Sequence, residues 1–495
     1  MNLSNLKLFG SAIYRPVWKT LPSQPEWQRT RTDSTFQANP PNGYKLSWVF
    51  EMPFEDNVVY FAFAPPYPYE EVLKTIEACQ EACPPDALLY RETLARSLDN
   101  RNIDLLTISN KENFKQKREA RQELLFPTHQ PRCYAGTKPV VFATARVHPG
   151  ETPASFMMDG FLKAVLALDK KGYNLRKNFV FKIIPILNPD GVFRGHYRVD
   201  QNGRNLNRFY QSPCSETPSI YAAKTYFEYL YYTQPGVSIY LDFHAQASKR
   251  SCFVFGNNIK NDSQVENELF AKLIELNSQY FEYSECDFSE RSMSTKDPKD
   301  QKTKEGSGRV ALHKSTGVIM SYTVECSYYI PRQLHSLPNL PNKRRSKVTE
   351  PRLPTIGGVY VFNRQMFDNV GQGLAYAILD YYNINPCSRL PLSEFKNLDN
   401  IRSNIKKLIE LRQRRATRGN YQKSLNQILT KRFEKSESLQ YNRKPIPRML
   451  HKVTKVSPVF SFLNNTAKPT LQDKLTPQSR VRSFNAAFKP GTIDS

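Results

Sequence analysis

The sequence lacks any apolar run long enough to cross a membrane. Its longest candidates in 495 residues, such as Val58–Ala64, are the size of a strand, whereas a membrane helix needs about 18 apolar residues. The N-terminus has no basic segment followed by an unbroken apolar stretch, so we expect no secretory signal. Cysteine is also sparse, with eight scattered residues and no disulfide-scaffold or zinc-finger spacing. These absences exclude a transmembrane protein and predict a cytosolic one with reduced thiols.

Negative charge is scarce, particularly towards the C-terminus. The chain has 70 Lys and Arg against 46 Asp and Glu, a net charge of +24. Residues 386–495 contribute 23 basic and 7 acidic residues, or 23 − 7 = +16. This composition predicts a basic, mostly disordered tail over 385–495, with one helix near Glu394–Leu411. Such a tail is attracted to acidic polymers; a solvated linker or a localisation signal is the alternative.

The rest of the chain divides into two regions with different secondary-structure patterns. Residues 1–67 contain short aromatic strand patterns between turns and predict a small β-rich domain. Residues 68–384 alternate buried strands with helices, which predicts an α/β domain with helices on both faces of a sheet. The expected strands are Val140–Val147, Phe179–Leu187, Val237–Phe243 and Met320–Val324. The expected helices are Pro153–Asp169, Ser219–Tyr232, Val265–Leu276 and Gln365–Tyr382. We read Leu334–Pro354, with its prolines and basic residues, as an exposed insertion.

Polar residues follow three of these strands directly. His148 and Glu151 stand three apart after the first strand, His244 ends another, and Glu325 ends a third. Ligands of an α/β sheet gather beyond the carboxyl ends of its strands. Two histidines and one carboxylate, with a fourth position open, are the ligands of a hydrolytic zinc site. The spacing of His148, Glu151 and His244 therefore predicts a metal site.

Eight segments of the chain form recognisable motifs in a fixed order. They are HPGETPASF (148–156), LNPDGV (187–192), GHYR (195–198), NLNR (205–208), DFHA (242–245), SKRSCFVFGN (248–257), KEGSGRVA (304–311) and YTVEC (322–326). These segments resemble the cytosolic carboxypeptidases, a family of zinc metallocarboxypeptidases that trim tubulin. The resemblance covers about residues 14–384 and is greatest to the type-5 branch, which removes glutamates at branch points. It implies a mixed β-sheet flanked by helices, preceded by a shortened β-sandwich.

The resemblance also implies roles for the residues at the strand ends. His148, Glu151 and His244 would bind one zinc ion. Glu325 would be the general base, taking a proton from the attacking water and passing it to the leaving amine. Arg198 would polarise the scissile carbonyl and stabilise the oxyanion.

Three further residues match the family's substrate contacts. Asn207 and Arg208 would bind the α-carboxylate of the substrate, for which a guanidinium fork is suited. Arg309 falls where the family has a basic residue facing the C-terminal side chain, which would favour glutamate; a loop cation is the alternative reading. Asn205 departs from the family, because many relatives have an aspartate there that orients a zinc-ligand histidine.

The resemblance implies a zinc-dependent enzyme that removes glutamates from polyglutamylated proteins, chiefly tubulin tails and including branch points. We expect a cytoplasmic monomer associated with microtubules and the cytoskeleton, at cilia or the spindle and also in the nucleus. Membranes and specific nucleic acids are not expected partners. Two alternatives stay open: a non-catalytic relative that binds microtubules through its basic tail, and a zinc deacylase of small acyl-amino acids.

Overall fold

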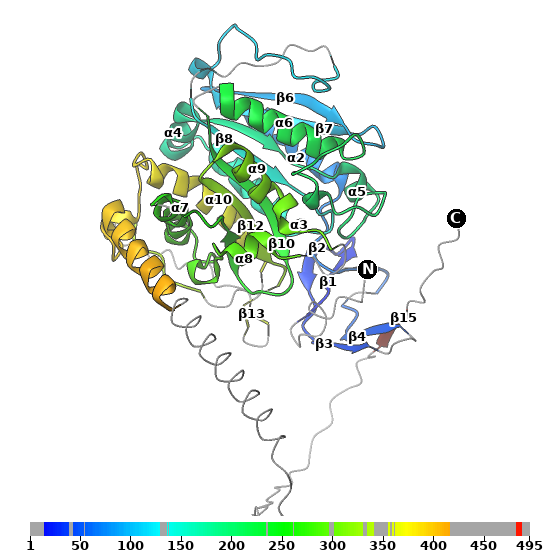
Figure 1. Cartoon of the computed structure of the whole chain (residues 1–495). Coiled ribbons are helices and arrows are strands. Elements are labelled where there is room, and N and C mark those ends of the chain that lie inside the picture. Colours follow the sequence, from blue (N-terminus) through cyan, green and yellow to red (C-terminus); the bar gives the residue numbers. More distant parts are fainter. Residues whose placement is uncertain are drawn as a thin grey trace, which may run out of the picture. The chain divides into compact units, whose positions relative to one another are not determined.

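The computed structural model places most of the chain, and Figure 1 shows it as a cartoon. The residues that it describes are 14–38, 43–53, 55–128, 136, 138–233, 236–260, 262–296, 301–329, 334–340, 355–356, 359–360, 362–415 and 482–487. Within these ranges, every helix is too short or too polar to span a lipid bilayer.

A mixed sheet of seven strands forms the centre of residues 87–327, in the order β11-β12-β10-β8-β9-β7-β6. The four middle strands, β12, β10, β8 and β9, run parallel. The outer strands β11, β7 and β6 are antiparallel to their neighbours. The bounds are β6 (Ala87–Arg96), β7 (Asn102–Asn110), β8 (Val140–Ala145), β9 (Val180–Ile184), β10 (Val237–Gln246), β11 (Cys252–Phe255) and β12 (Met320–Ser327).

Helices cover both faces of this sheet (Figure 1). On one face α3 packs on β8, β10 and β12, with α10 across it and α7 beside α10; on the other, α6 and α9 pack on β10. The longer helices are α2 (Tyr69–Glu81), α3 (Thr152–Val165), α4 (Lys170–Asn178), α6 (Pro218–Thr233), α7 (Ser263–Asn277), α9 (Gly308–Thr316) and α10 (Arg364–Tyr381). The short ones are η1 (Lys111–Asn113), α5 (Pro189–Phe193), η2 (Leu206–Arg208), η3 (Tyr283–Glu285), α8 (Glu290–Ser294), η4 (Lys304–Gly306) and η5 (Leu390–Leu392).

The predicted fold class is confirmed by this arrangement. Every strand and helix expected between residues 140 and 382 is present, because buried strands and amphipathic helices leave clear apolar patterns. The helix expected over Pro153–Asp169 ends earlier, at Val165 of α3. Asp169 is the N-cap residue of the next helix, α4, and its Oδ1 accepts a hydrogen bond from the Gly172 amide at 2.9 Å. Of the expected insertion, residues 341–354 lie outside the described residues.

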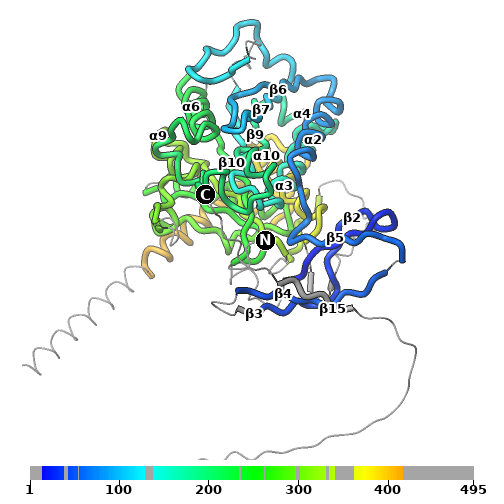
Figure 2. The backbone as a smooth tube through the Cα atoms, turned by 90° about the vertical axis from the view of Figure 1, so that its right-hand side faces the viewer, coloured from blue at the N-terminus to red at the C-terminus, as the bar shows by residue number. Residues whose placement is uncertain are grey.

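The five N-terminal strands and β15, from near the C-terminus, form two antiparallel sheets of three strands each. One has the order β2-β1-β5 and the other β15-β4-β3, and Figure 2 shows β2 to β5 gathered at one side of the central sheet. The bounds are β1 (Val17–Leu21), β2 (Gln24–Arg29), β3 (Ser34–Ala38), β4 (Tyr44–Phe50), β5 (Val58–Ala62) and β15 (Arg482–Ala487). Two short strands after the central sheet, β13 (Thr355–Ile356) and β14 (Val359–Tyr360), pair with each other.

The structure differs from the predicted domain boundary at residue 384. The compact unit that contains the sheet continues to Ile405, because Ile401 and Ile405 are buried and Arg402 forms an ion pair with Glu266 of α7 at 2.7 Å. Residues 398–415 are helical, in place of the helix expected over Glu394–Leu411. The strand β15, from the predicted tail, pairs with β4. The tail residues 416–481 lie outside the described residues.

The expectation of reduced thiols is wrong for one pair of cysteines. Cys252 of β11 lies directly opposite Cys326 of β12, and the two form a disulfide. Both are buried, with a Cα–Cα distance of 4.1 Å. The antiparallel pairing of β11 with β12 places Cys252 opposite Cys326. The spacing of cysteines in the sequence does not reveal which strands pair or in which register.

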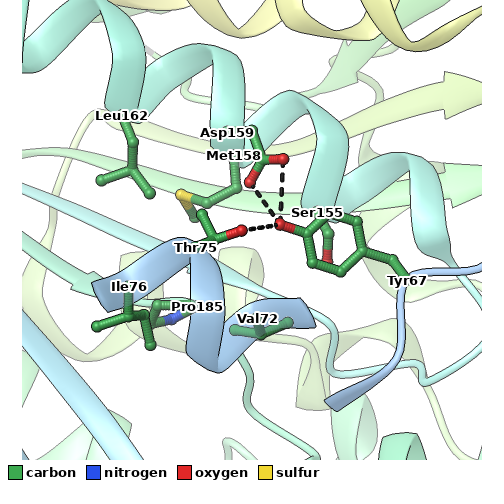
Figure 3. Close-up of a pocket in the computed structure, with 9 residues that line it drawn as sticks. All are labelled: Tyr67, Val72, Thr75, Ile76, Ser155, Met158, Asp159, Leu162 and Pro185. Carbon is green, nitrogen blue, oxygen red and sulfur yellow. Dashed lines mark hydrogen bonds between the residues drawn. The ribbon is translucent and has the colours of Figure 1, made fainter. Parts of the chain in front are cut away.

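A small pocket behind α3 contains a buried acid (Figure 3). The Tyr67 hydroxyl lies 2.8 Å from Asp159 Oδ1 and 2.6 Å from Thr75 Oγ1. Burial raises the pKa of Asp159 from its ordinary value of 3.8 to about 7, although the Tyr67 hydrogen bond and Arg364 oppose this. The folded protein therefore keeps a proton here that the unfolded chain releases.

This proton should make stability depend on pH. Because the folded state binds more protons at Asp159, its stability should fall as the pH rises from about 4 to about 7. Asp159→Asn removes this titration, so the free energy of unfolding of the variant should not share the decrease. Relative to the wild type, it should rise by an amount on the order of 2 kcal/mol between pH 5 and pH 8. Thermal unfolding at both values measures this, with exposed Asp262→Asn as control. An equal stability difference at both pH values would contradict the assignment.

Candidate zinc centre

Two of the three predicted ligands lie in one loop after β8. Arg146 of this loop has a left-handed backbone (φ 57°), and its buried guanidinium donates from Nε to the Pro149 carbonyl at 3.0 Å. Gly150 comes so close to Tyr197 that a Cβ atom at this position would lie 2.7 Å from the Tyr197 carbonyl oxygen. The loop is therefore held tightly, and His148 and Glu151 turn towards the same point before α3 begins.

The structure brings the third predicted ligand to the same place. His148 Nδ1 is 2.8 Å from Glu151 Oε1, and His244 Nδ1 is 2.9 Å from Glu151 Oε2. All three residues are buried, and one ligand atom from each lies within 4.8 Å of the others. Buried nitrogen and oxygen donors converging in this way fit a zinc ion, which takes two histidines and a carboxylate and leaves one position open. The donor set therefore fits the predicted metal.

The outer nitrogen of each imidazole has its own acceptor. His148 Nε2 is 3.0 Å from Asn205 Oδ1, and His244 Nε2 is 2.8 Å from Asp242 Oδ2. These partners direct both Nδ1 atoms towards Glu151 and the predicted metal position. Asn205 thus orients a ligand without carrying charge. Asp242 was missed by the sequence reasoning, although its place two residues before His244 on one strand puts both side chains on the same face.

Charge is concentrated in this cluster. Burial opposes ionisation of Glu151, but His148 and His244 outweigh it and hold its pKa well below the ordinary value. The pKa of His148 is lowered to about 4 by burial and by Arg198. The pKa of His244 is raised well above the ordinary value, because Asp242 and Glu151 outweigh its burial. A cation bound here would therefore displace a proton from His244.

Glu325 stands beside His244. The parallel strands β10 and β12 pair with His244 opposite Glu325. The Oε2 atom of Glu325 is buried and meets no hydrogen-bond partner among the described residues. Burial raises the pKa of Glu325 to about 7; Glu151 adds to this effect, while His244 and Arg198 oppose it. A carboxylate next to the ligands, unbonded and poised near neutral pH, has the properties of a general base.

The predicted substrate contacts surround the same point. Arg198 Nη1 is 3.4 Å from Glu151 Oε1. Asn207 is buried, with its Nδ2 atom 3.4 Å from His244 Nε2 and its Oδ1 accepting from the Gly308 amide at 3.0 Å. Arg208 follows it in η2 and donates to the Asn207 carbonyl at 2.7 Å. The structure thus brings Arg198 and Asn207 to the ligand cluster and Arg208 beside them.

The structure encloses Arg309, and its role towards the substrate stays a prediction. Its guanidinium is buried: Nη1 donates to the Gly256 carbonyl and to Asn257 Oδ1, and Nη2 donates to the Ser292 carbonyl at 3.1 Å. Its Nε atom is buried and meets no hydrogen-bond partner among the described residues. Burial lowers the pKa of Arg309 to about 10, and the Asp287 and Glu325 carboxylates oppose this decrease. Carbonyl groups therefore hold the guanidinium in place, with its Nε–H left over as a donor.

Comparison with known proteins agrees with this geometry. A family model described as "Zinc carboxypeptidase" matches residues 72–327. The chain is 34% identical to "Cytosolic carboxypeptidase-like protein 5" of Ailuropoda melanoleuca, over 81% of this chain and 56% of that protein. It is 33% identical to the protein of the same name from Danio rerio, over 82% and 58%. The chain thus spans just over half the length of these curated relatives.

A solved structure shares the fold. The putative carboxypeptidase A of Shewanella denitrificans superposes with a TM-score of 0.54 at 20% identity, covering 78% of this chain and 84% of the other. At this identity the likeness concerns the fold alone.

Proposed function

This chain belongs to the zinc carboxypeptidase family, and we propose that it is an active enzyme removing glutamates from polyglutamylated proteins. Its chief substrates are tubulin tails, and branch-point glutamates are included. The support for this specificity is the identity to relatives named cytosolic carboxypeptidase-like protein 5, together with basic residues at the substrate side of the site.

One observation carries the catalytic part of the proposal. The buried cluster of His148, Glu151 and His244 stands next to Glu325, whose buried Oε2 atom meets no hydrogen-bond partner in the part of the chain that the structure describes. A non-catalytic relative has no reason to keep a raised-pKa carboxyl beside three intact ligands, because burying it without a partner costs free energy. The alternative of a purely microtubule-binding protein is therefore disfavoured.

The residues divide the chemistry of peptide hydrolysis among them. His148, Glu151 and His244 would hold a zinc ion, which when bound would supply Lewis acidity to polarise a carbonyl and make water more acidic. Glu325 accepts the proton of the attacking water on its carboxylate, holds it, and gives it to the nitrogen of the departing amino acid. Because burial raises the pKa of Glu325 to about 7, this carboxylate can both accept the proton and release it near neutral pH.

The arginines bind the substrate and its developing charge. Arg198, half exposed beside Glu151, donates to the scissile carbonyl oxygen as negative charge grows there. Arg208 and Asn207 bind the α-carboxylate of the terminal residue, so only the last residue of a chain is positioned for cleavage. The requirement for this free carboxylate makes the enzyme a carboxypeptidase.

Synthetic peptides test the proposal directly. The zinc-loaded full chain should release glutamate from peptides with linear C-terminal glutamates and from peptides with one glutamate branched from a side chain. N-acetylglutamate serves as the deacylase substrate. Release of glutamate from neither peptide would overturn the proposal, and turnover of N-acetylglutamate alone would identify a deacylase. Product analysis by mass spectrometry distinguishes these results.

Binding to tubulin should depend on the basic residues beyond the described helix. Residues 416–481 contain 13 Lys and Arg and 3 Asp and Glu, a net charge of 13 − 3 = +10. Exchanging these Lys and Arg for Gln should weaken microtubule co-sedimentation at low salt, where their attraction to acidic tubulin is strongest. At 0.1 M salt, charges in contact with solvent are screened beyond about 10 Å, so the effect of the exchange should be smaller there. Cleavage of short peptides should be unchanged. Co-sedimentation that equals the wild type at low salt would contradict this role.

We place the protein in the cytoplasm, as the names of its relatives suggest, with association to microtubules and presence in the nucleus as further parts of the proposal. A monomer suffices for the site, because all its residues come from one chain.

A further inference from the structure

The arginine at the end of β2 contacts the segment that follows the predicted general base. Arg29 Nη1 donates to the Arg15 carbonyl at 2.9 Å, and Nη2 donates to the Tyr328 carbonyl. The guanidinium also lies over the ring of Tyr329, 5.0 Å from its centre. Tyr328 and Tyr329 come directly after β12, the strand that bears Glu325. One side chain of the N-terminal strands therefore holds the end of β12.

A buried apolar cluster surrounds this contact. It joins residues of the N-terminal region to the end of β10 and to the two tyrosines after β12. Its members are Tyr14, Leu46, Ala64, Ala245, Tyr328 and Tyr329. Phe63 packs against the cluster, with its ring centre 4.9 Å from that of Tyr328. Because closely packed side chains transmit a displacement to their neighbours, a change at Arg29 should be felt at the ends of both strands.

Tyr328 connects the Arg29 contact to the loop of the metal ligands. The Tyr328 side chain is buried, and its hydroxyl donates to the Gly150 carbonyl at 3.2 Å. Gly150 lies between His148 and Glu151, the two ligands in this loop. Two hydrogen bonds and one tyrosine therefore link the guanidinium of Arg29 to the backbone of the ligand loop.

We propose that Arg29 is a positioning residue, which acts through Tyr328 to fix the ligand loop and the end of β12. Its partners are two backbone carbonyls and an aromatic ring, so it acts on the site indirectly. The N-terminal strands then contribute to the geometry of the metal centre. The effect on turnover rests on the proposed function, whereas the effect on metal binding can be measured without a substrate.

The zinc affinity of the full chain, measured by competition with a chelator, tests this role. Arg29→Gln removes the charged fork, so the affinity should fall about tenfold, the lower end of the effect of groups that orient metal ligands. The visible spectrum of the cobalt-loaded variant should change as well, because it depends on the geometry of the ligands. Arg29→Lys keeps a charged donor and should restore part of the affinity. Arg31→Gln, at an exposed arginine two residues further on, is the matched control.

Turnover gives a second readout of Arg29. At saturating zinc, kcat of Arg29→Gln on a peptide ending in glutamate should fall, because the ligand loop and the strand of Glu325 are held less firmly. KM should stay at the wild-type value, because the assigned substrate contacts lie on other segments. A residue that serves stability alone would lower the melting temperature and leave kcat of the folded protein unchanged.

A double-mutant cycle tests the route through Tyr328. Tyr328→Phe removes the hydroxyl that meets Gly150 and should by itself lower zinc affinity. If Arg29 acts through this hydroxyl, Arg29→Gln should cause little further loss in the Tyr328→Phe protein. Losses that add in full would overturn the proposal.

The outcomes separate this role from the proposed function. If Arg29→Gln leaves zinc affinity, cobalt spectrum and kcat at the wild-type values, Arg29 is a structural residue and the proposal is overturned. If Arg29→Gln does not fold, Tyr328→Phe decides, and an unchanged zinc affinity in that variant would overturn the proposal. If the wild type cleaves no glutamate peptide but zinc affinity falls as expected, the proposed function fails and the role of Arg29 stands. A wild type that binds no zinc would overturn both.

Discussion

Glu325→Gln should bind zinc normally and lose nearly all turnover. Glutamine has the shape of glutamate and cannot accept a proton, so kcat should fall by about 10²–10⁴-fold, the usual contribution of a general base. Zinc content should be unaffected, because Glu325 lies beside the ligand cluster and is not one of its three members. Metal analysis and peptide hydrolysis on the same preparation measure both quantities. Near-normal turnover would show that another group is the base.

The pH profile gives a second readout of Glu325. Burial raises its pKa to about 7, and a bound cation would lower this value by adding positive charge nearby. Because the base must be ionised, kcat/KM of the wild type should fall with decreasing pH at or below pH 7. The residual activity of Glu325→Gln should lack this decrease. Glu290→Gln, at the exposed start of α8, is a control that should leave rate and profile unchanged.

Removal of the metal should abolish activity, and zinc should restore it. Glu151 is the carboxylate that both histidines contact, so Glu151→Ala should lose stoichiometric zinc and with it nearly all activity. Chelation of the wild type should have an equal effect and also lower the melting temperature, because a metal that binds only the folded state stabilises it.

A variant that only weakens zinc binding distinguishes loss of the metal from loss of folding. Asp242→Asn keeps an acceptor for His244 Nε2 and removes the charge, so zinc affinity should fall about 10- to 100-fold with activity recoverable at high zinc. Full activity after chelation, or in Glu151→Ala, would contradict a metal centre at this position.

The sheet and the ligand cluster could be predicted because each depends on short-range patterns. The strands before His148, His244 and Glu325 are buried runs, and a parallel sheet brings their carboxyl ends to one edge. Contacts between distant segments leave no such pattern. The pairing of β15 with β4 and the burial of Ile401 became visible only in the folded chain.

The same limit explains the substrate side of the site. The motif KEGSGR (304–309) predicts a basic segment, but the motif does not reveal how each side chain is held. Packing decides it: the guanidinium of Arg309 is buried and donates to the Gly256 carbonyl and to Asn257. Charge type could be predicted from the sequence, but burial could not.

Mass spectrometry of glutamylated tubulin tests the central claim most directly. The zinc-loaded full chain, incubated with tubulin carrying linear and branched glutamate chains, should shorten those chains in steps of one glutamate residue. The Glu325→Gln protein, prepared with the same zinc content, should leave the spectrum as it was. Unchanged tubulin masses after incubation with the zinc-loaded wild type, on linear and branched chains alike, would contradict the claim that this protein is a deglutamylase.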